Sequence, residues 1–178
     1  VGHHVRSVLV RQGVRTRAFT HSSLDPALAK MTNAEVMTIR HSRSLRTTQF
    51  LPKLTKLRSL FIISAPNLAG EQLVASLRHV TMPNLCGIEL KDVGDLDEGH
   101  VLEIVKSAPN LIWLDVVTTP ITPVIGSLIK GACVRLDSID FLVPPTYEAQ
   151  WLFLIRNCCL WKEVHIGVHA KEVLFPQV

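Results

Sequence analysis

The sequence predicts an α/β solenoid, in which short strands and helices alternate along the chain and stack into one domain. Three observations lead to this prediction. A strand pattern with apolar residues at its first, fourth and sixth positions returns every 23 to 29 residues. A helical pattern follows most of these strands. The hydrophobic fraction of 47% in 178 residues is enough to bury one sizeable core.

The apolar pattern places the strand half of each unit. Leu57, Leu60 and Ile62 form one copy of it. We predict a single solenoid over residues 1–178, with residues 1–33 fitting least closely and units beginning near residues 5, 34, 57, 85, 111, 136 and 161. Because side chains alternate along a strand, positions 4 and 6 of a unit should point into the core, and positions 3, 5 and 7 should face outward.

The helical half of each unit has its own period. One helix is predicted by apolar residues at i, i+3, i+4 and i+7, which are Val101, Ile104, Val105 and Ala108. The same spacing begins at Ile125 and at Trp151, and Trp151 and Trp161 are expected in the core. Asp97 and Thr146 are expected to cap helices, and Pro123 to lie near the start of one.

The residue three places before a unit is apolar or small, as a tight helix-to-strand junction requires; these residues are Leu54, Met82, Ala108, Cys133 and Cys158. Two of the four cysteines are therefore expected to be small buried hydrophobic residues. No C-x-x-C pair or histidine spacing completes a zinc site, and no metal or other cofactor is expected. No signal-peptide pattern opens the sequence, so reduced thiols and an intracellular location, cytoplasmic or nuclear, are expected. The longest uncharged stretch, residues 116–129, contains two prolines, and no contact with a membrane is predicted.

Several segments resemble a known repeat family. Residues 107–116 read Ser-Ala-Pro-Asn-Leu-Ile-Trp-Leu-Asp-Val, and residues 156–166 follow a similar order. The sequence resembles the leucine-rich repeat family, whose motif begins L-x-x-L-x-L, closely over residues 34–170 and loosely before them. It looks most like the repeats of fungal-type F-box proteins. The resemblance implies a curved solenoid with a parallel sheet on the concave side and helices on the convex side. Position 9 lacks the family's usual Asn or Cys, so irregular loops are expected.

The resemblance also implies a function, that of a protein–protein interaction module. The subgroup implies the substrate-recognition repeats of an F-box-type ubiquitin ligase subunit. Its partners would be a protein substrate and, through an F-box upstream of Val1, a Skp1-type adaptor and a cullin. A general leucine-rich repeat scaffold outside ubiquitin transfer accounts for the repeats equally well. No phosphate-binding loop or nucleophile elbow occurs, and an enzyme is not predicted.

The outward strand positions supply the candidate binding site. Position 5 of the successive units reads Leu9, Thr38, Phe61, Glu89, Asp115, Asp140 and His165. Neighbouring strands lie about 4.8 Å apart, so the three carboxylates should form a column, at a cost of a fraction of a kcal/mol per pair. We predict a partner-binding surface on the concave face made by Phe61, Glu89, Trp113, Asp115, Asp140 and His165. Ordinary solvated strand residues are the alternative. A metal site from Asp115, Asp140 and His165 is disfavoured, because the three would lie in a line across three strands.

Charge is distributed unevenly along the chain. The formal net charge is +4, yet residues 1–58 contain eleven lysines and arginines and only two acidic residues, Asp25 and Glu35. A nucleic-acid contact through this basic N-terminal third is one hypothesis, and a solvated basic face is the other. No RNA-reading aromatic motif or zinc-finger spacing accompanies the basic residues, so a nucleic-acid partner is disfavoured.

Overall fold

The computed structural model describes residues 5–11, 21–158 and 162–168. Strands and helical turns alternate along these residues, as the two sequence periods predict. The elements are β1 (Ser7–Arg11), α1 (His21–Leu28), β2 (Val36–Arg40), the 3-10 turn η1 (Leu51–Lys53), β3 (Ser59–Ala65), α2 (Gly70–Leu77), β4 (Gly87–Val93), α3 (Glu98–Lys106), β5 (Trp113–Pro120), α4 (Pro123–Ala132), β6 (Ser138–Val143), the 3-10 turn η2 (Pro145–Tyr147), α5 (Glu148–Cys158) and β7 (Glu163–Val168).

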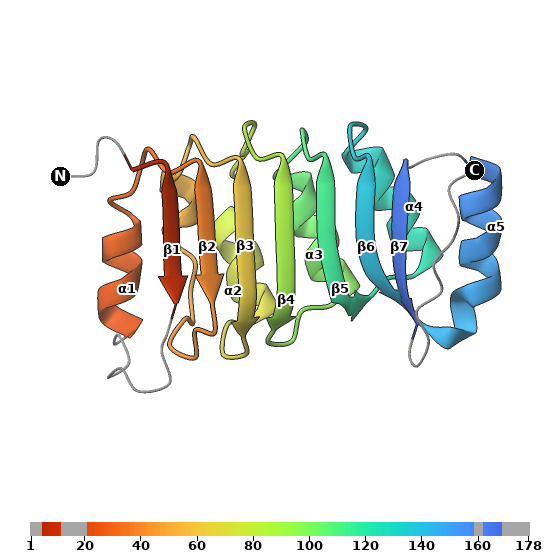
Figure 1. Ribbon diagram of the computed structural model, residues 1–178, viewed down its shortest axis with the longest axis horizontal. Coiled ribbons are helices and arrows are strands. Elements are labelled where there is room, and N and C mark those ends of the chain that lie inside the picture. The colour runs from red at the N-terminus through yellow and green to blue at the C-terminus, as the bar shows by residue number, and fades with distance from the viewer. Residues whose placement is uncertain (1–4, 12–20, 159–161, 169–178) are drawn as a thin grey trace.

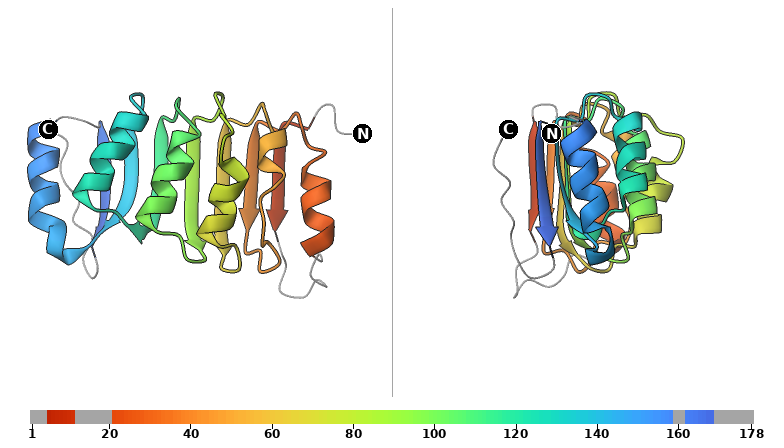
Figure 2. Two further views of the ribbon diagram at one scale, coloured as in Figure 1. Left: turned by 180° about the vertical axis from the view of Figure 1, so that it is seen from behind. Right: turned by 90° about the vertical axis from the view of Figure 1, so that its right-hand side faces the viewer.

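The strands form one parallel sheet, which in the described residues has seven strands in the chain order β1 to β7. Helices α2, α3 and α4 pack against one face of the sheet, and α1 and α5 lie at its two ends (Figures 1 and 2). Among the described residues no helix lies on the opposite face, and we call it the open face. The architecture is the predicted α/β solenoid, and the predicted curvature stays a prediction.

Each strand begins two residues after a predicted unit start. Positions 4 and 6 therefore fall on the helix-covered face, and in four successive units they are at most 2% exposed: Leu60, Ile62, Ile88, Leu90, Leu114, Val116, Ile139 and Phe141. Full burial of each such side chain is worth about 1.5–3 kcal/mol, so this double row is a large part of the stabilising core. The start predicted at Trp161 lies outside the described residues.

Trp151 and Cys133 are buried as predicted. The Trp151 indole has no exposed surface, packs against the Phe141 ring with centroids 4.4 Å apart and planes tilted by 44°, and donates its N–H to the Ile121 carbonyl at 2.8 Å. Cys133 is fully buried, its thiol lies 3.1 Å from the Ala108 carbonyl, and burial raises the pKa of that thiol. The Cys158 side chain and all of Cys159 lie outside the described residues.

The unit that starts near residue 34 has no α-helix, which accounts for its short length. Between β2 and β3 the chain forms a loop over residues 41–50 and then the turn η1. The loop places the side chains of Ser42, Leu45, Thr48 and Phe50 in the core, each at most 2% exposed. These inward residues cover the core where other units use a helix.

The predicted helix starts are confirmed in two cases and wrong in one. Asp97 caps α3, its carboxylate accepting from the His100 N–H at 2.8 Å, and Pro123 is the first residue of α4. Thr146 does not cap a helix, because it lies inside η2 and α5 begins only at Glu148. Two prolines just before this point set up the 3-10 turn and shift the helix start.

The loops after the strands are more regular than predicted. His41, Ser64 and Asp92 occupy the eighth position of successive units, and all three have positive φ values, of 53°, 56° and 50°. Hydrogen bonds between units replace the missing Asn or Cys ladder, as when Ser64 Oγ donates to Asp92 Oδ2 at 3.3 Å. The prediction of irregular loops was wrong for these three units. The pairing of β5 with β6 does shift register, between Val116 and Pro120.

Candidate functional site: the open face of the sheet

The strand register places the position 5 residues side by side on the open face. Phe61 pairs with Glu89, Glu89 with Asp115, Asp115 with Asp140, and Asp140 with His165. The carboxylates of three adjacent strands therefore form one row. Trp113 lies two residues before Asp115, in the neighbouring row. All six residues of the candidate site thus occupy five consecutive strands.

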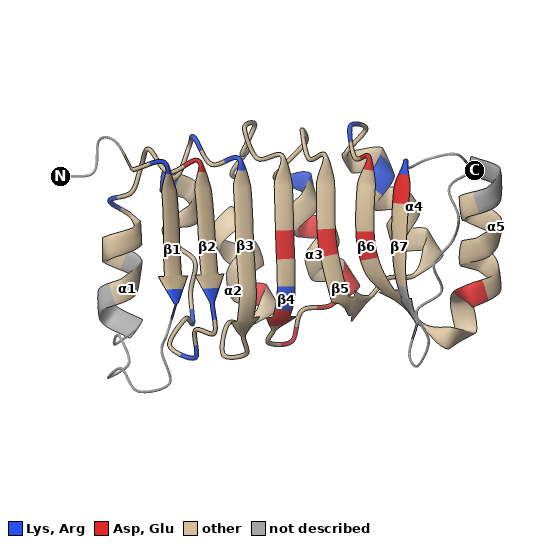
Figure 3. Ribbon diagram, in the orientation of Figure 1, with Lys and Arg blue, Asp and Glu red and all other residues tan. Residues whose placement is uncertain are grey.

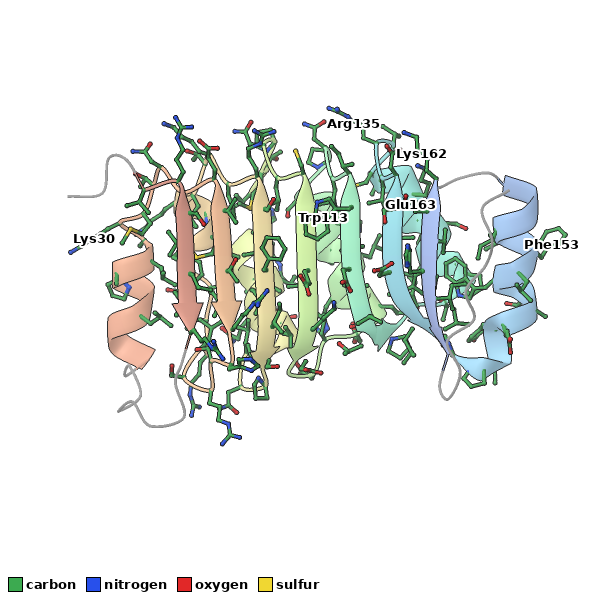
Figure 4. All side chains as sticks on the ribbon, viewed as in Figure 1. Lys30, Trp113, Arg135, Phe153, Lys162 and Glu163 are labelled. Atoms are coloured by element: carbon green, nitrogen blue, oxygen red, sulfur yellow. The ribbon has the colours of Figure 1, made fainter. Side chains whose placement is uncertain are left out.

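A glycine on β4 allows the aromatic side chains of Phe61 on β3 and Trp113 on β5 to meet. Gly87 is the register partner of Trp113, and a Cβ built on Gly87 would lie 2.0 Å from the Trp113 ring. The indole, labelled in Figure 4, therefore lies across the bare backbone of β4. It reaches Phe61 on β3, with ring centroids 5.5 Å apart and planes tilted by 41°. Both rings are half-buried. The aromatic pair forms a preorganised apolar patch on the open face.

Lys91 neutralises part of the acidic row. Its ammonium lies 2.6 Å from Asp115 Oδ2 and 2.9 Å from Glu89 Oε1. Burial of the ammonium opposes its charge, but the hydrogen bonds to Asp115 and Glu89 outweigh that effect and raise the pKa of Lys91. The two carboxylates and the lysine are thus held in a fixed arrangement. The sequence placed Lys91 at position 7 of its unit and gave no indication of this bridge.

Asp140 is the acidic residue that Lys91 does not bridge. Its Oδ1 atom is buried and has no hydrogen-bond partner among the described residues. The His165 ring lies on the next strand, and its Nδ1 is 3.9 Å from Oδ1, beyond hydrogen-bond distance. Burial raises the pKa of the Asp140 carboxyl above its ordinary value of 3.8, although His165 and Lys91 oppose the shift. An acceptor without a donor is energetically unfavourable, and a ligand that donates to it would relieve this.

The open face is graded in charge (Figure 3). Arginines lie at the ends of β1 and β2, and acidic residues lie on β4 to β7. Between them, the outward residues of β3 include Phe61 and Ile63 and carry no charge. In the described part of the chain, no group of three His, Cys, Asp or Glu residues is arranged to hold a metal ion. In that same part, none of the helices has the length and apolar character needed to cross a membrane. The face has the groups for binding a macromolecule of mixed charge and apolar character.

Comparisons with known proteins bear on the fold. No protein-family model matches the sequence, and no curated protein matches it either. The structure is similar to that of an internalin, a leucine-rich repeat protein from Listeria monocytogenes, with a TM-score of 0.59 and 14% sequence identity. The match covers 92% of this chain and 42% of that chain, so this chain spans less than half of its neighbour's length. The likeness shows the fold, which is that of a leucine-rich repeat solenoid.

Proposed function

We propose that this chain is a protein-interaction module that binds its partner across the open face, as the substrate-recognition repeats of an F-box-type ubiquitin ligase subunit. One observation carries the proposal. The half-buried Phe61–Trp113 pair lies beside a row of carboxylates, two of which Lys91 holds in place, on a face that none of the described helices covers. The leucine-rich repeat fold supports an interaction module, and the Pro-Asn-Leu segments before the strands support the F-box subgroup.

The aromatic pair is suited to anchor a partner. Tryptophan is among the residues that contribute most to binding energy when an interface covers them. Because Trp113 already rests against Phe61 and across Gly87, little side-chain freedom remains to be lost on binding. The adjacent carboxylates would select a partner segment that presents a cationic side chain, and Asp140 Oδ1 would accept from it. In a ubiquitin ligase subunit, the contribution of this site would be to hold a substrate close to a ubiquitin-loaded partner.

The Asn residues of the Pro-Asn-Leu segments have a structural role of their own. Asn84 Nδ2 donates to the Thr55 carbonyl at 2.9 Å, and Asn110 Nδ2 donates to the Pro83 carbonyl at 2.9 Å. Each bond joins one unit to the preceding unit at the edge where the strands begin. The motif therefore stabilises the stacking of the units, and the assignment to a ligase depends on what the full-length protein assembles with.

The test is capture of partners by the full-length protein, in two matched variants. The open-face variant is Trp113→Ala with Asp140→Lys. The helix-side control is Leu128→Ala with Glu103→Lys, which also removes one exposed apolar side chain and reverses one exposed acid. We expect the proteins captured by the wild type to fall about tenfold with the open-face variant and to persist with the control. Equal capture by both variants would reject the open face as the binding surface.

The same capture tests the ligase role separately. An F-box is a module distinct from the repeats, so the adaptor and the cullin should be recovered with the wild type and with both variants. Loss of the substrate with retention of adaptor and cullin is the predicted pattern. If other proteins are captured while adaptor and cullin are absent from every sample, the chain is a general scaffold outside ubiquitin transfer.

A further inference from the structure

A second charged surface lies at the other end of the open face. It consists of Arg11, Arg40, Arg43 and Arg46, and we call it the arginine corner. Arg11 and Arg40 end β1 and β2 and are direct register partners. Arg43 and Arg46 follow in the loop after β2. All four are exposed, and Figure 3 shows basic segments at this end of the two strands and in that loop.

The backbone that carries these arginines is held in place. In the loop, the buried residues Ser42 and Leu45 alternate with the exposed Arg43 and Arg46. The Arg43 carbonyl accepts from Asn67 Nδ2 at 2.6 Å. A hydrogen bond of 2.9 Å between Thr48 and Ser76 ties the next part of the loop to α2. The guanidinium groups therefore project from a fixed backbone, which lowers the entropy lost when they bind a ligand.

Three residues of the arginine corner have no acidic partner among the described residues. Within the residues that the structure describes, no ion pair joins Arg11, Arg40 or Arg46 to a carboxylate, whereas some other cations are paired, as in Lys162–Asp137 at 2.8 Å and Arg6–Glu35 at 3.5 Å. Like charges on directly opposed strand residues, such as Arg11 and Arg40, are destabilising. The corner thus holds positive charge that a bound anionic group would compensate.

We propose that the arginine corner binds an acidic segment of the same protein partner that covers Phe61 and Trp113, which rests on the proposed function of the open face. Arg40 pairs with Ile63, and two residues earlier Thr38 pairs with Phe61, so the corner adjoins the aromatic pair. From β1 to β3 is about 10 Å, which three or four extended residues span. The partner would therefore place acidic residues over β1 and β2, apolar residues over β3 to β5, and a basic residue beside Asp140.

Carboxylates are favoured over a nucleic-acid backbone for two reasons. Affinity for nucleic acid comes largely from the neutralisation of many phosphates along the backbone, and the corner has four arginines. Arginine binds a carboxylate with two parallel hydrogen bonds, so two acidic residues suffice to occupy much of the corner.

The test uses a fluorescent octaglutamate peptide and the full chain, with binding measured by fluorescence anisotropy at low and at physiological salt. The corner variant is Arg40→Glu with Arg46→Glu. The control is Arg58→Glu with Arg135→Glu, which gives the same change in net charge through two exposed arginines at the opposite edge of the sheet. We expect the corner variant to weaken binding about tenfold and the control to change it less than about twofold. A neutral version, Arg40→Gln with Arg46→Gln, should weaken it to an intermediate degree.

Each other result overturns the proposal. An equal loss of octaglutamate binding in the corner and control variants would mean that binding depends only on the net charge of the protein. Stronger binding of a single-stranded DNA oligonucleotide of equal charge at physiological salt would assign the corner to nucleic acid. The open-face variant Trp113→Ala with Asp140→Lys separates this proposal from the preceding one. It should keep octaglutamate binding even if partner capture proves independent of the open face.

Discussion

Replacing Gly87 by alanine should displace the Trp113 indole while leaving the fold intact. A Cβ at residue 87 would lie 2.0 Å, 2.2 Å and 2.2 Å from three atoms of the Trp113 ring. Carbon atoms in favourable contact are about 3.5–4.0 Å apart, so the ring must move by about 1.5 Å or more. Because Trp113 is on the open face, it can rotate toward solvent. That rotation separates it from Phe61.

The expected change in stability is small because two effects offset each other. Loss of the aromatic pair removes about 0.5–1.5 kcal/mol. A Gly→Ala change at a compatible backbone position restores about 0.4–1 kcal/mol by restricting the unfolded chain. The net change should stay within about 1 kcal/mol, which corresponds to about 2–4 °C in Tm for a domain of this size.

The assay is fluorine NMR of protein labelled with fluorotryptophan, together with thermal unfolding. The Trp113 resonance is assigned with the Trp113→Phe variant. Gly131→Ala is the control, since a Cβ there meets no atom within 4 Å. We expect Gly87→Ala to shift the Trp113 resonance and Gly131→Ala to leave it in place. An unshifted Trp113 resonance, or a fall in Tm far beyond a few degrees, would refute the argument that the bare backbone of residue 87 supports the ring.

Three further predictions concern buried and charged groups. Gly126→Ala would put a Cβ 2.1 Å from the ring of Trp151, which is fully buried and cannot rotate toward solvent. Urea titration should therefore show a loss of about 1–3 kcal/mol in the free energy of unfolding, and a loss no larger than that of Gly87→Ala would contradict this. Lys91→Met would leave the carboxylates of Glu89 and Asp115 unbridged on adjacent strands and should lower the free energy of unfolding by about 1 kcal/mol, with partial recovery of stability in high salt. A loss of stability that does not respond to salt would count against the bridge. Because burial raises its pKa, Asp140 keeps its proton to higher pH in the folded state than in the unfolded state, so the stability of the wild type relative to Asp140→Asn should fall as pH rises from 3.8 through the raised pKa. A constant difference in stability over that range would show that burial does not perturb the carboxyl.

The repeated apolar pattern was sufficient to predict most of the fold from the sequence. Apolar residues at positions 4 and 6 return at nearly constant spacing, and a parallel sheet with stacked units is the arrangement that buries them all. The same alternation places Glu89, Asp115 and Asp140 in one row, because strands in register align equivalent positions. The second unit was less predictable, since its loop over residues 41–50 covers the core with separated inward side chains that follow no helical period.

The details of the site depended on contacts between units, which no single unit encodes. Trp113 leans toward β4 because Gly87 has no side chain, and that glycine is 26 residues earlier in the chain. Lys91 reaches a carboxylate on its own strand and another on the next strand. The repeating positive φ values of the loops were also unexpected, because hydrogen bonds between adjacent units, rather than a conserved type of side chain within a unit, satisfy these turns.

The most direct measurement of the central claim, that the open face is the protein-binding surface, is site-specific photo-crosslinking in the full-length protein. Benzoylphenylalanine is placed at Phe61 on the open face, where an aromatic ring is kept, or at Val124, which is 70% exposed on the helix side. We predict that illumination joins the partner to the chain from residue 61 and not from residue 124. Crosslinks from residue 124 alone would contradict the account and place the partner on the helices.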